Sequence, residues 1–181
     1  MYPNTELHKY DYFMSIDDES KFTKEVPYDF FEVISKQKDM AGALKLTDSV
    51  DKPPKQNNFD TRIEMHSFVL EYMKKHHLQP KCEFVEKIFD AKSGEKYFHE
   101  KLIYSDSYVF KNKLFETEEW QRWNKEVNKS GGIYKFRWGD HELNSLFFLI
   151  HYGKPVYDFK TVDEGYHDQG GFRNIQNYAP G

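Results

Sequence analysis

Apolar residues along this chain change from the alternating spacing typical of strands to the three- and four-residue spacing typical of helices. Strands are expected around Tyr12, Ala43, Tyr134 and Val156 and within 101–110. Helices are expected over 27–38, over 59–78, after Thr117 and from Asp140 onward. This alternation of strands and helices predicts an α/β fold, with a mixed sheet flanked by helices.

The clearest helical pattern covers residues 59–78. We expect this helix to be buried along the apolar stripe Ile63, Val69, Leu70 and Met73. Thr117 is a favourable N-cap for a later helix, which should end at the glycine pair 131–132. Asp140 is expected to cap the helix that follows in the same way.

Composition narrows the class of protein. The chain has 181 residues, 38% of them hydrophobic, which predicts one domain over 1–181 with a core of its own. The net charge is −4 and no basic stripe is present, so a nucleic-acid partner is not expected. The longest apolar run, 146–150, is far shorter than the ~20 residues of a membrane span. No signal peptide is recognised at Met1, and the single Cys82 excludes an intramolecular disulfide.

Three acids, Asp17, Asp18 and Glu19, follow the aromatic strand that begins near Tyr10. Carboxylates at the C-terminal end of a strand lie where open α/β sheets bind ligands. In an extended segment Asp17 and Glu19 share a face, and two hard oxygen ligands so placed suit Mg²⁺ or Mn²⁺. The alternative is an acidic turn that only ends the strand.

Two later segments carry further motifs in a fixed order. Residues 129–140 contain Ser-Gly-Gly and then Arg-Trp-Gly-Asp, and residues 163–168 contain Gly-Tyr-His-Asp. Together with 10–22, they resemble the fungal-type α-1,2-mannosyltransferases of glycosyltransferase family 15. The resemblance is strongest at Arg-Trp-Gly-Asp and thin between residues 45 and 104. It implies the C-terminal part of a GT-A glycosyltransferase sheet, without the N-terminal nucleotide-binding half.

The resemblance also implies a metal site that uses Mn²⁺ or Mg²⁺. Asp17 stands at the position of the family's manganese-binding Glu, and Glu19 stands where the family has an Asp. His167 resembles the family's late metal-binding His. Because one residue is missing between Tyr166 and His167, the ligand position could instead fall on Asp168.

The remaining site residues follow from the same motifs. Asp140 is expected at the sugar end of the site, where it would hold donor or acceptor hydroxyls, or it is only a helix cap. Arg137, Trp138 and Tyr166 are expected to bind substrate; Arg137 suits a phosphate, and Trp138 offers a flat face to a sugar ring or packs in the core.

One position departs from the family's pattern. The family has a Glu beneath the reactive carbon of the sugar, and Tyr108 stands there in this chain. A tyrosine cannot act as a carboxylate, so Asp106, two residues away and on the same strand face, is the candidate substitute.

The function implied is transfer of a hexose, mannose from GDP-mannose, to a glycan acceptor by a metal-dependent enzyme. The alternatives are a non-catalytic carbohydrate- or nucleotide-binding remnant of the family and an unrelated α/β domain. Family members are Golgi enzymes with a membrane anchor, whereas the single cysteine and the lack of a recognised signal leave a cytoplasmic location open.

Overall fold

The computed structural model describes residues 6–18, 20–46, 64–83, 85, 107–161 and 163–169. These residues form two compact units, each built from segments that are distant in sequence. The sheet unit contains 6–18, 20–46, 107–114, 156–161 and 163–169. The helical unit contains 64–83, 85 and 115–155. The single domain expected from chain length stays a prediction.

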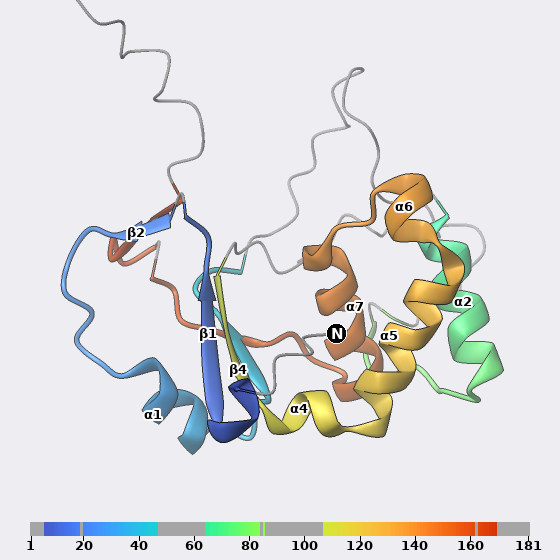
Figure 1. Cartoon of the computed structure of the whole chain (residues 1–181), viewed down its shortest axis with the longest axis horizontal. Coiled ribbons are helices and arrows are strands. Elements are labelled where there is room, and N and C mark those ends of the chain that lie inside the picture. The colour runs from blue at the N-terminus through green and yellow to red at the C-terminus, as the bar shows by residue number, and fades with distance from the viewer. Residues whose placement is uncertain are drawn as a thin grey trace, which may run out of the picture. The chain divides into compact units, whose positions relative to one another are not determined.

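The sheet unit is built on four strands in the order β1, β4, β3, β5, and β1 and β4 can be followed side by side in Figure 1. The strands are β1 (Tyr12–Ile16), β3 (Ala41–Ala43), β4 (Ser107–Lys111) and β5 (Tyr157–Asp158). Strand β4 is antiparallel to β1 and β3, while β3 is parallel to β5. The α/β class with a mixed sheet flanked by helices is therefore confirmed.

Strand β1 follows a single turn of 3-10 helix, η1 (Leu7–Lys9). The side chain of Asn112, just after β4, donates to the carbonyl of Leu7 at 2.6 Å. The backbone N–H of Asn112 donates to the carbonyl of Asp11 at 2.8 Å. These bonds tie the start of β1 to the end of its neighbour.

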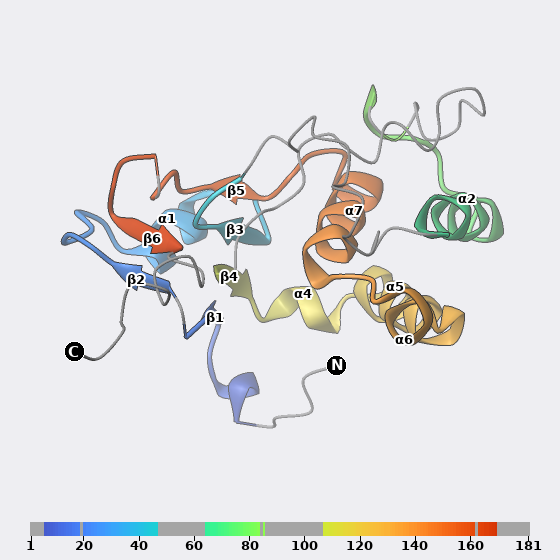
Figure 2. The same ribbon diagram turned by 90° about the horizontal axis from the view of Figure 1, so that it is seen from above.

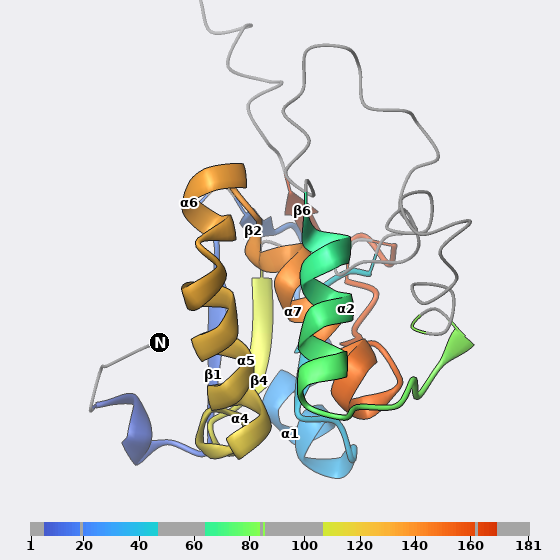
Figure 3. The ribbon, with the colours of Figure 1, turned by 90° about the vertical axis from the view of Figure 1, so that its right-hand side faces the viewer.

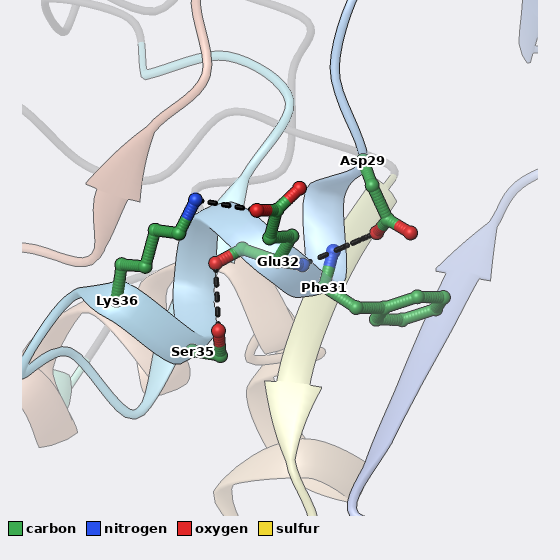
Figure 4. Close-up of polar contacts among 5 residues, drawn as sticks. All are labelled: Asp29, Phe31, Glu32, Ser35 and Lys36. Atoms are coloured by element: carbon green, nitrogen blue, oxygen red, sulfur yellow. Dashed lines mark hydrogen bonds and ion pairs between the residues drawn. The ribbon is translucent and has the colours of Figure 1, made fainter.

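Helix α1 (Phe30–Lys36) is shorter than the predicted 27–38 because Asp29 determines where it begins. The Asp29 carboxylate accepts from the backbone N–H groups of Phe31 and Glu32, at 2.7 and 3.2 Å (Figure 4). One turn later Glu32 pairs with Lys36, while the Ser35 hydroxyl donates to the Glu32 carbonyl at 2.7 Å (Figure 4). The cap and the ion pair stabilise this short helix.

Helix α1 packs on the sheet at a glycine. The buried residues of this core are Ile34, Leu44, Val109 and Phe159. A Cβ atom at Gly42 would lie 2.5 Å from Phe159 Cε2 and 2.9 Å from Ile34 Cδ1. Only glycine leaves room for this close approach of helix to strand.

A second, two-stranded sheet pairs a segment from the first part of the chain with one from its last part (Figure 2). Strand β2 (Ser20–Phe22) pairs antiparallel with β6 (His167–Gln169). We call this pair the β2–β6 ribbon.

The helical unit contains α2 (Met65–Lys75), α5 (Glu118–Ser130), α6 (Gly132–Phe136) and α7 (Asp140–Tyr152), which are visible in Figure 3. A short helix, α4 (Lys113–Glu116), links β4 to this part of the chain. In the described part of the chain, no helix is long and apolar enough to cross a membrane.

The prediction of one continuous helix over 59–78 is wrong. Glu64 has a left-handed backbone with φ 61°, so the helix begins at Met65, and it ends at Lys75. Val69 and Met73 are buried as predicted, whereas Leu70 is only half-buried. The predicted start, 59–63, lies outside the described residues.

The cap of α5 is confirmed. The Thr117 hydroxyl accepts from the backbone N–H of Trp120 at 3.3 Å, and the helix ends at Gly131, whose φ is 70°. The predicted cap of α7 is wrong, because Gly139 takes the N-cap position and Asp140 is the first helical residue. Asp140 still places a carboxylate in the first turn, which suits the positive end of the helix dipole.

The strand predicted around Tyr134 is also wrong. Residues 132–136 form the short helix α6, because the Gly131 carbonyl accepts from the N–H groups of Tyr134 and Lys135 at 3.0 and 2.9 Å. The left-handed Gly131 ends one helix and starts the next. Tyr134 is 83% exposed, so no neighbouring strand supports it.

A buried polar contact joins helices α2 and α7 of the helical unit. The Tyr72 hydroxyl lies 2.9 Å from His151 Nε2, and both side chains are buried. The Arg122 charge acts on both side chains of this pair. Burial, reinforced by the Arg122 charge, lowers the pKa of His151 to about 4.

This contact should make stability depend on pH. The unfolded chain takes up a proton at His151 near pH 6.5, whereas the folded chain resists it down to about pH 4. Stability is therefore fully present above pH 6.5 and falls as the pH drops, by roughly 3 kcal/mol at pH 4. Urea denaturation between pH 7 and 4.5 measures this, and His151→Gln should show a shallower decline. Parallel declines in the two proteins would show that His151 does not titrate in this way.

A second prediction concerns Val69, which is fully buried on α2. Val69→Asp should lower the free energy of unfolding by about 3 kcal/mol or more, because an unpaired carboxylate would be buried. Ser67→Asp is the matched control, since it adds the same charge at an exposed position two residues earlier. Equal urea midpoints for the two variants would mean that the buried face of α2 is assigned wrongly.

Candidate functional site

The acidic segment follows β1 as a turn. The Asp17 carbonyl accepts from the backbone N–H of Ser20 at 3.0 Å, so the chain turns here and does not continue extended. Asp17 and Asp18 are both exposed, and Glu19 lies outside the described residues. That Asp17 and Glu19 share a face therefore stays a prediction, since it assumes an extended backbone through Glu19.

Asp17 directly follows the C-terminal end of β1. The register pairs Ile16 with Ser107 and Ala43 with both Tyr108 and Asp158. The C-terminal ends of β1, β3 and β5 therefore lie at the same end of the sheet, where β4 begins. Open α/β sheets bind ligands at the C-terminal ends of their strands.

Thr161 connects the end of β3 to the start of β6. Its backbone N–H and its hydroxyl both donate to the Leu44 carbonyl, at 3.0 and 2.7 Å. Its own carbonyl accepts from the N–H groups of Tyr166 and His167, at 2.7 and 3.0 Å. Thr161 was not among the predicted site residues, because a lone threonine carries no signal of its own in the sequence.

The β2–β6 ribbon then brings His167 beside the segment that follows the acidic turn. His167 pairs with Phe22, their ring centroids are 5.7 Å apart, and the imidazole is 3% exposed. Asp168 is exposed on the opposite face, where its carboxylate lies 3.9 Å from Lys21. The two candidate ligands at the end of the chain thus have different surroundings.

Two of the predicted ligand side chains have the chemistry that a small divalent cation requires. A carboxylate at Asp17 and an imidazole at His167 are the ligand types that Mn²⁺ accepts. Across the described ranges, no group of three or more His, Cys, Asp or Glu side chains is placed to hold a metal ion. Because Glu19 is outside those ranges, a site of three ligands stays a prediction.

Tyr108 lies within the sheet. It is 5% exposed on β4, opposite Ser15 and Ala43, and its ring centroid is 5.4 Å from that of Phe110. This placement is that of a core residue. Asp106, the proposed substitute carboxylate, is outside the described residues, so its role stays a prediction.

The Arg-Trp-Gly-Asp motif lies in the helical unit, between α6 and α7. Arg137 is exposed with a left-handed backbone, φ 56°, and Asp140 is exposed. Trp138 is 5% exposed and its ring centroid lies 5.1 Å from that of Phe68. Burial favours core packing for this indole. That Arg137 and Asp140 meet Asp17 or the half-exposed Tyr166 stays a prediction, because these belong to the sheet unit.

Gly132 explains why glycine precedes this motif. A Cβ atom there would lie 2.3 Å from the Trp138 atoms Cδ2 and Cε3, so the indole lies directly on the glycine backbone. Ser130 supports the turn, since its hydroxyl donates to Val127 and accepts from the N–H of Gly132, at 2.6 and 3.1 Å. The spacing from Ser-Gly-Gly to Trp is thus a packing requirement.

Comparisons with known proteins give a family and a fold. The sequence model of the glycolipid 2-alpha-mannosyltransferase family matches residues 1–171. No curated protein sequence matches the chain significantly.

Solved structures show the same fold at low sequence identity. The mannosyltransferase Ktr4p from S. cerevisiae is 16% identical with a TM-score of 0.62, over 81% of this chain and 38% of that one. Its complex with GDP is 15% identical with a TM-score of 0.61, over 86% and 38%. The Mn/GDP form of core-mannan synthase A from Aspergillus fumigatus is 14% identical with a TM-score of 0.59, over 87% and 40%. This chain therefore spans about two fifths of these proteins.

Packing at Gly132 yields a prediction. Gly132→Ala should destabilise the helical unit by roughly 1–3 kcal/mol, because its methyl group displaces the Trp138 ring. Gly139→Ala, on the other side of the tryptophan, is the control, since its Cβ would meet only the movable Glu142 carboxylate. Urea denaturation followed by tryptophan fluorescence measures both. Similar midpoints would show that the indole does not lie on Gly132.

Proposed function

Because this chain belongs to the glycolipid 2-alpha-mannosyltransferase family, we propose that it serves the metal-dependent transfer of mannose from GDP-mannose to a glycan acceptor. The observation that supports the proposal is the β2–β6 pairing, which joins His167 to Phe22, in the segment that follows Asp17. His167 and Asp17 lie 150 positions apart in sequence (167 − 17), so nothing local brings their segments together. The GDP complex of Ktr4p and the Mn/GDP form of core-mannan synthase A support the choice of ligand class.

The transfer exchanges one bond to the anomeric carbon for another. The bond from this carbon to the diphosphate breaks, and its electron pair leaves with the diphosphate. The acceptor hydroxyl oxygen bonds to the carbon and gives its proton to a base. When bound, a divalent cation supplies Lewis-acid stabilisation of the diphosphate charge.

The residues of this chain would bind the metal ion and the substrates and orient them. Asp17, Glu19 and His167 would hold Mn²⁺ or Mg²⁺, since carboxylate and imidazole groups suit such ions. Arg137 would pair with a phosphate through its planar guanidinium. Asp140 would accept hydrogen bonds from sugar hydroxyls, with Tyr166 and Trp138 as apolar surfaces, and Asp106 would be the carboxylate near the reactive carbon.

One observation favours a second candidate function, non-catalytic binding of a nucleotide or glycan. Tyr108, at the position of the family's Glu, is buried among core aromatics and brings no carboxylate to the site. Under this alternative, Asp17→Ala would leave glycan binding intact, and no transfer of labelled mannose would be detected with the unmodified chain.

The main proposal is tested by calorimetric titration of GDP into the chain, with Mn²⁺ and with a chelator. Binding should require the metal, and Asp17→Asn should weaken it at least tenfold, because a ligand charge is lost. Asp18→Asn is the control, an exposed neighbour without a family role. Metal-independent binding, or no binding, counts against the proposal. Equal losses in the two variants would contradict the predicted geometry at the end of the strand, and no loss in either would show that the acids form only a turn.

The same titration separates the two candidate ligands on β6. His167→Gln should weaken Mn²⁺-dependent binding, whereas Asp168→Asn, on the opposite face of the ribbon, should have little effect. Thermal midpoints identify any loss of folding, since His167 is buried. A larger effect of the Asp168 variant would move the ligand position to that residue.

A further inference from the structure

The β2–β6 pairing extends one residue beyond the strands. The Thr23 N–H donates to the Tyr166 carbonyl at 2.7 Å, and the Thr23 hydroxyl donates to the Gly165 carbonyl at 2.6 Å. Thr23 therefore clamps the loop before β6 from both its backbone and its side chain. Its neighbour Lys24 is held beside that loop, although the two segments are far apart in sequence.

The loop is shaped to receive the lysine side chain. Gly165 has a left-handed backbone, φ 75°, and a Cβ there would lie 3.2 Å from the Lys24 ammonium. Without that methyl group, Lys24 passes over the loop and places its ammonium 6.0 Å from the centre of the Tyr166 ring. The ring attracts the cation but does not neutralise it.

Lys24 differs from the other lysines around the ribbon in its partners. Lys21 lies 3.9 Å from the Asp168 carboxylate, and Lys45 lies 3.8 Å from that of Asp163. Among the described residues, Lys24 forms no such ion pair, and its side chain is exposed. The charge of Lys24, held beside the Tyr166 ring, is thus available to bind an anion.

The position of Lys24 suggests which anion. One residue separates Lys24 from Phe22, the partner of His167, so the Cα atoms of Lys24 and Phe22 are at most about 7 Å apart. A diphosphate held by a metal at His167 would bring negative charge to this part of the ribbon. Lysine is a common point-charge partner of phosphate groups.

We propose that Lys24, held over Tyr166 by the Thr23 clamp, binds the diphosphate of the nucleotide. This inference rests on the proposed function and adds to it a residue that discriminates diphosphates from uncharged nucleosides. The Tyr166 ring would restrict the lysine side chain before the ligand binds, so less side-chain freedom is lost on binding.

The test is calorimetric titration of GDP and of guanosine in the presence of Mn²⁺. Lys24→Met keeps the apolar stem and removes the charge, and it should weaken GDP binding at least tenfold and leave guanosine binding unchanged. Lys24→Arg should restore most of the GDP affinity. Lys21→Met is the matched control, an exposed lysine of the same ribbon that already has a carboxylate partner, and it should change GDP affinity less than twofold.

Each other outcome overturns the inference. Equal GDP affinity of the unmodified chain and Lys24→Met would show that the ammonium does not meet the phosphates. Equal losses in Lys24→Met and Lys21→Met would reveal only general charge attraction. Failure of the unmodified chain to bind GDP would overturn both this inference and the proposed function, whereas intact Mn²⁺-dependent binding with a silent Lys24 variant removes this inference alone.

Discussion

The carbonyl oxygen of Leu44 accepts two hydrogen bonds from the fully buried Thr161, and the candidate site depends on this contact. The bonds tie the segment that leaves β5 to the end of β3. The Thr161 carbonyl in turn orients Tyr166 and His167 through their N–H groups. One small polar residue therefore determines where β6 begins and, through it, which residues meet β2.

The same segment links the site to the core. Phe159, two residues before Thr161, donates its N–H to the Ala43 carbonyl at 3.0 Å, and its ring lies against the backbone of Gly42. The Tyr28 hydroxyl donates to the Phe159 carbonyl at 3.0 Å, and burial raises the pKa of Tyr28 to about 12, which keeps this donor protonated. Packing of α1 on the sheet and placement of the ribbon are thus coupled by residues that touch both.

Of the two helix caps predicted from local backbone chemistry, the one at Thr117 was confirmed and the one at Asp140 was wrong. The Thr117 cap and the end of α5 at Gly131 depend on interactions within one or two turns, which the sequence displays directly. The Ile-Tyr-Lys-Phe run was misread because alternation over four residues does not exclude one helical turn, and Gly131 decided the outcome. The start of α2 was missed because a left-handed glutamate has no signal in the apolar spacing.

The sequence by itself determined the α/β class and, through its ordered motifs, the family. It could not determine how Asp17, His167 and Lys24 are related, because segments from opposite ends of the chain meet through β2–β6 pairing. Nor could it show that His167 lies inward and Asp168 outward, since that follows from the register of the ribbon. Long-range hydrogen bonds and close packing determine which segments meet and which side chains face inward, and neither has a fixed spacing along the sequence.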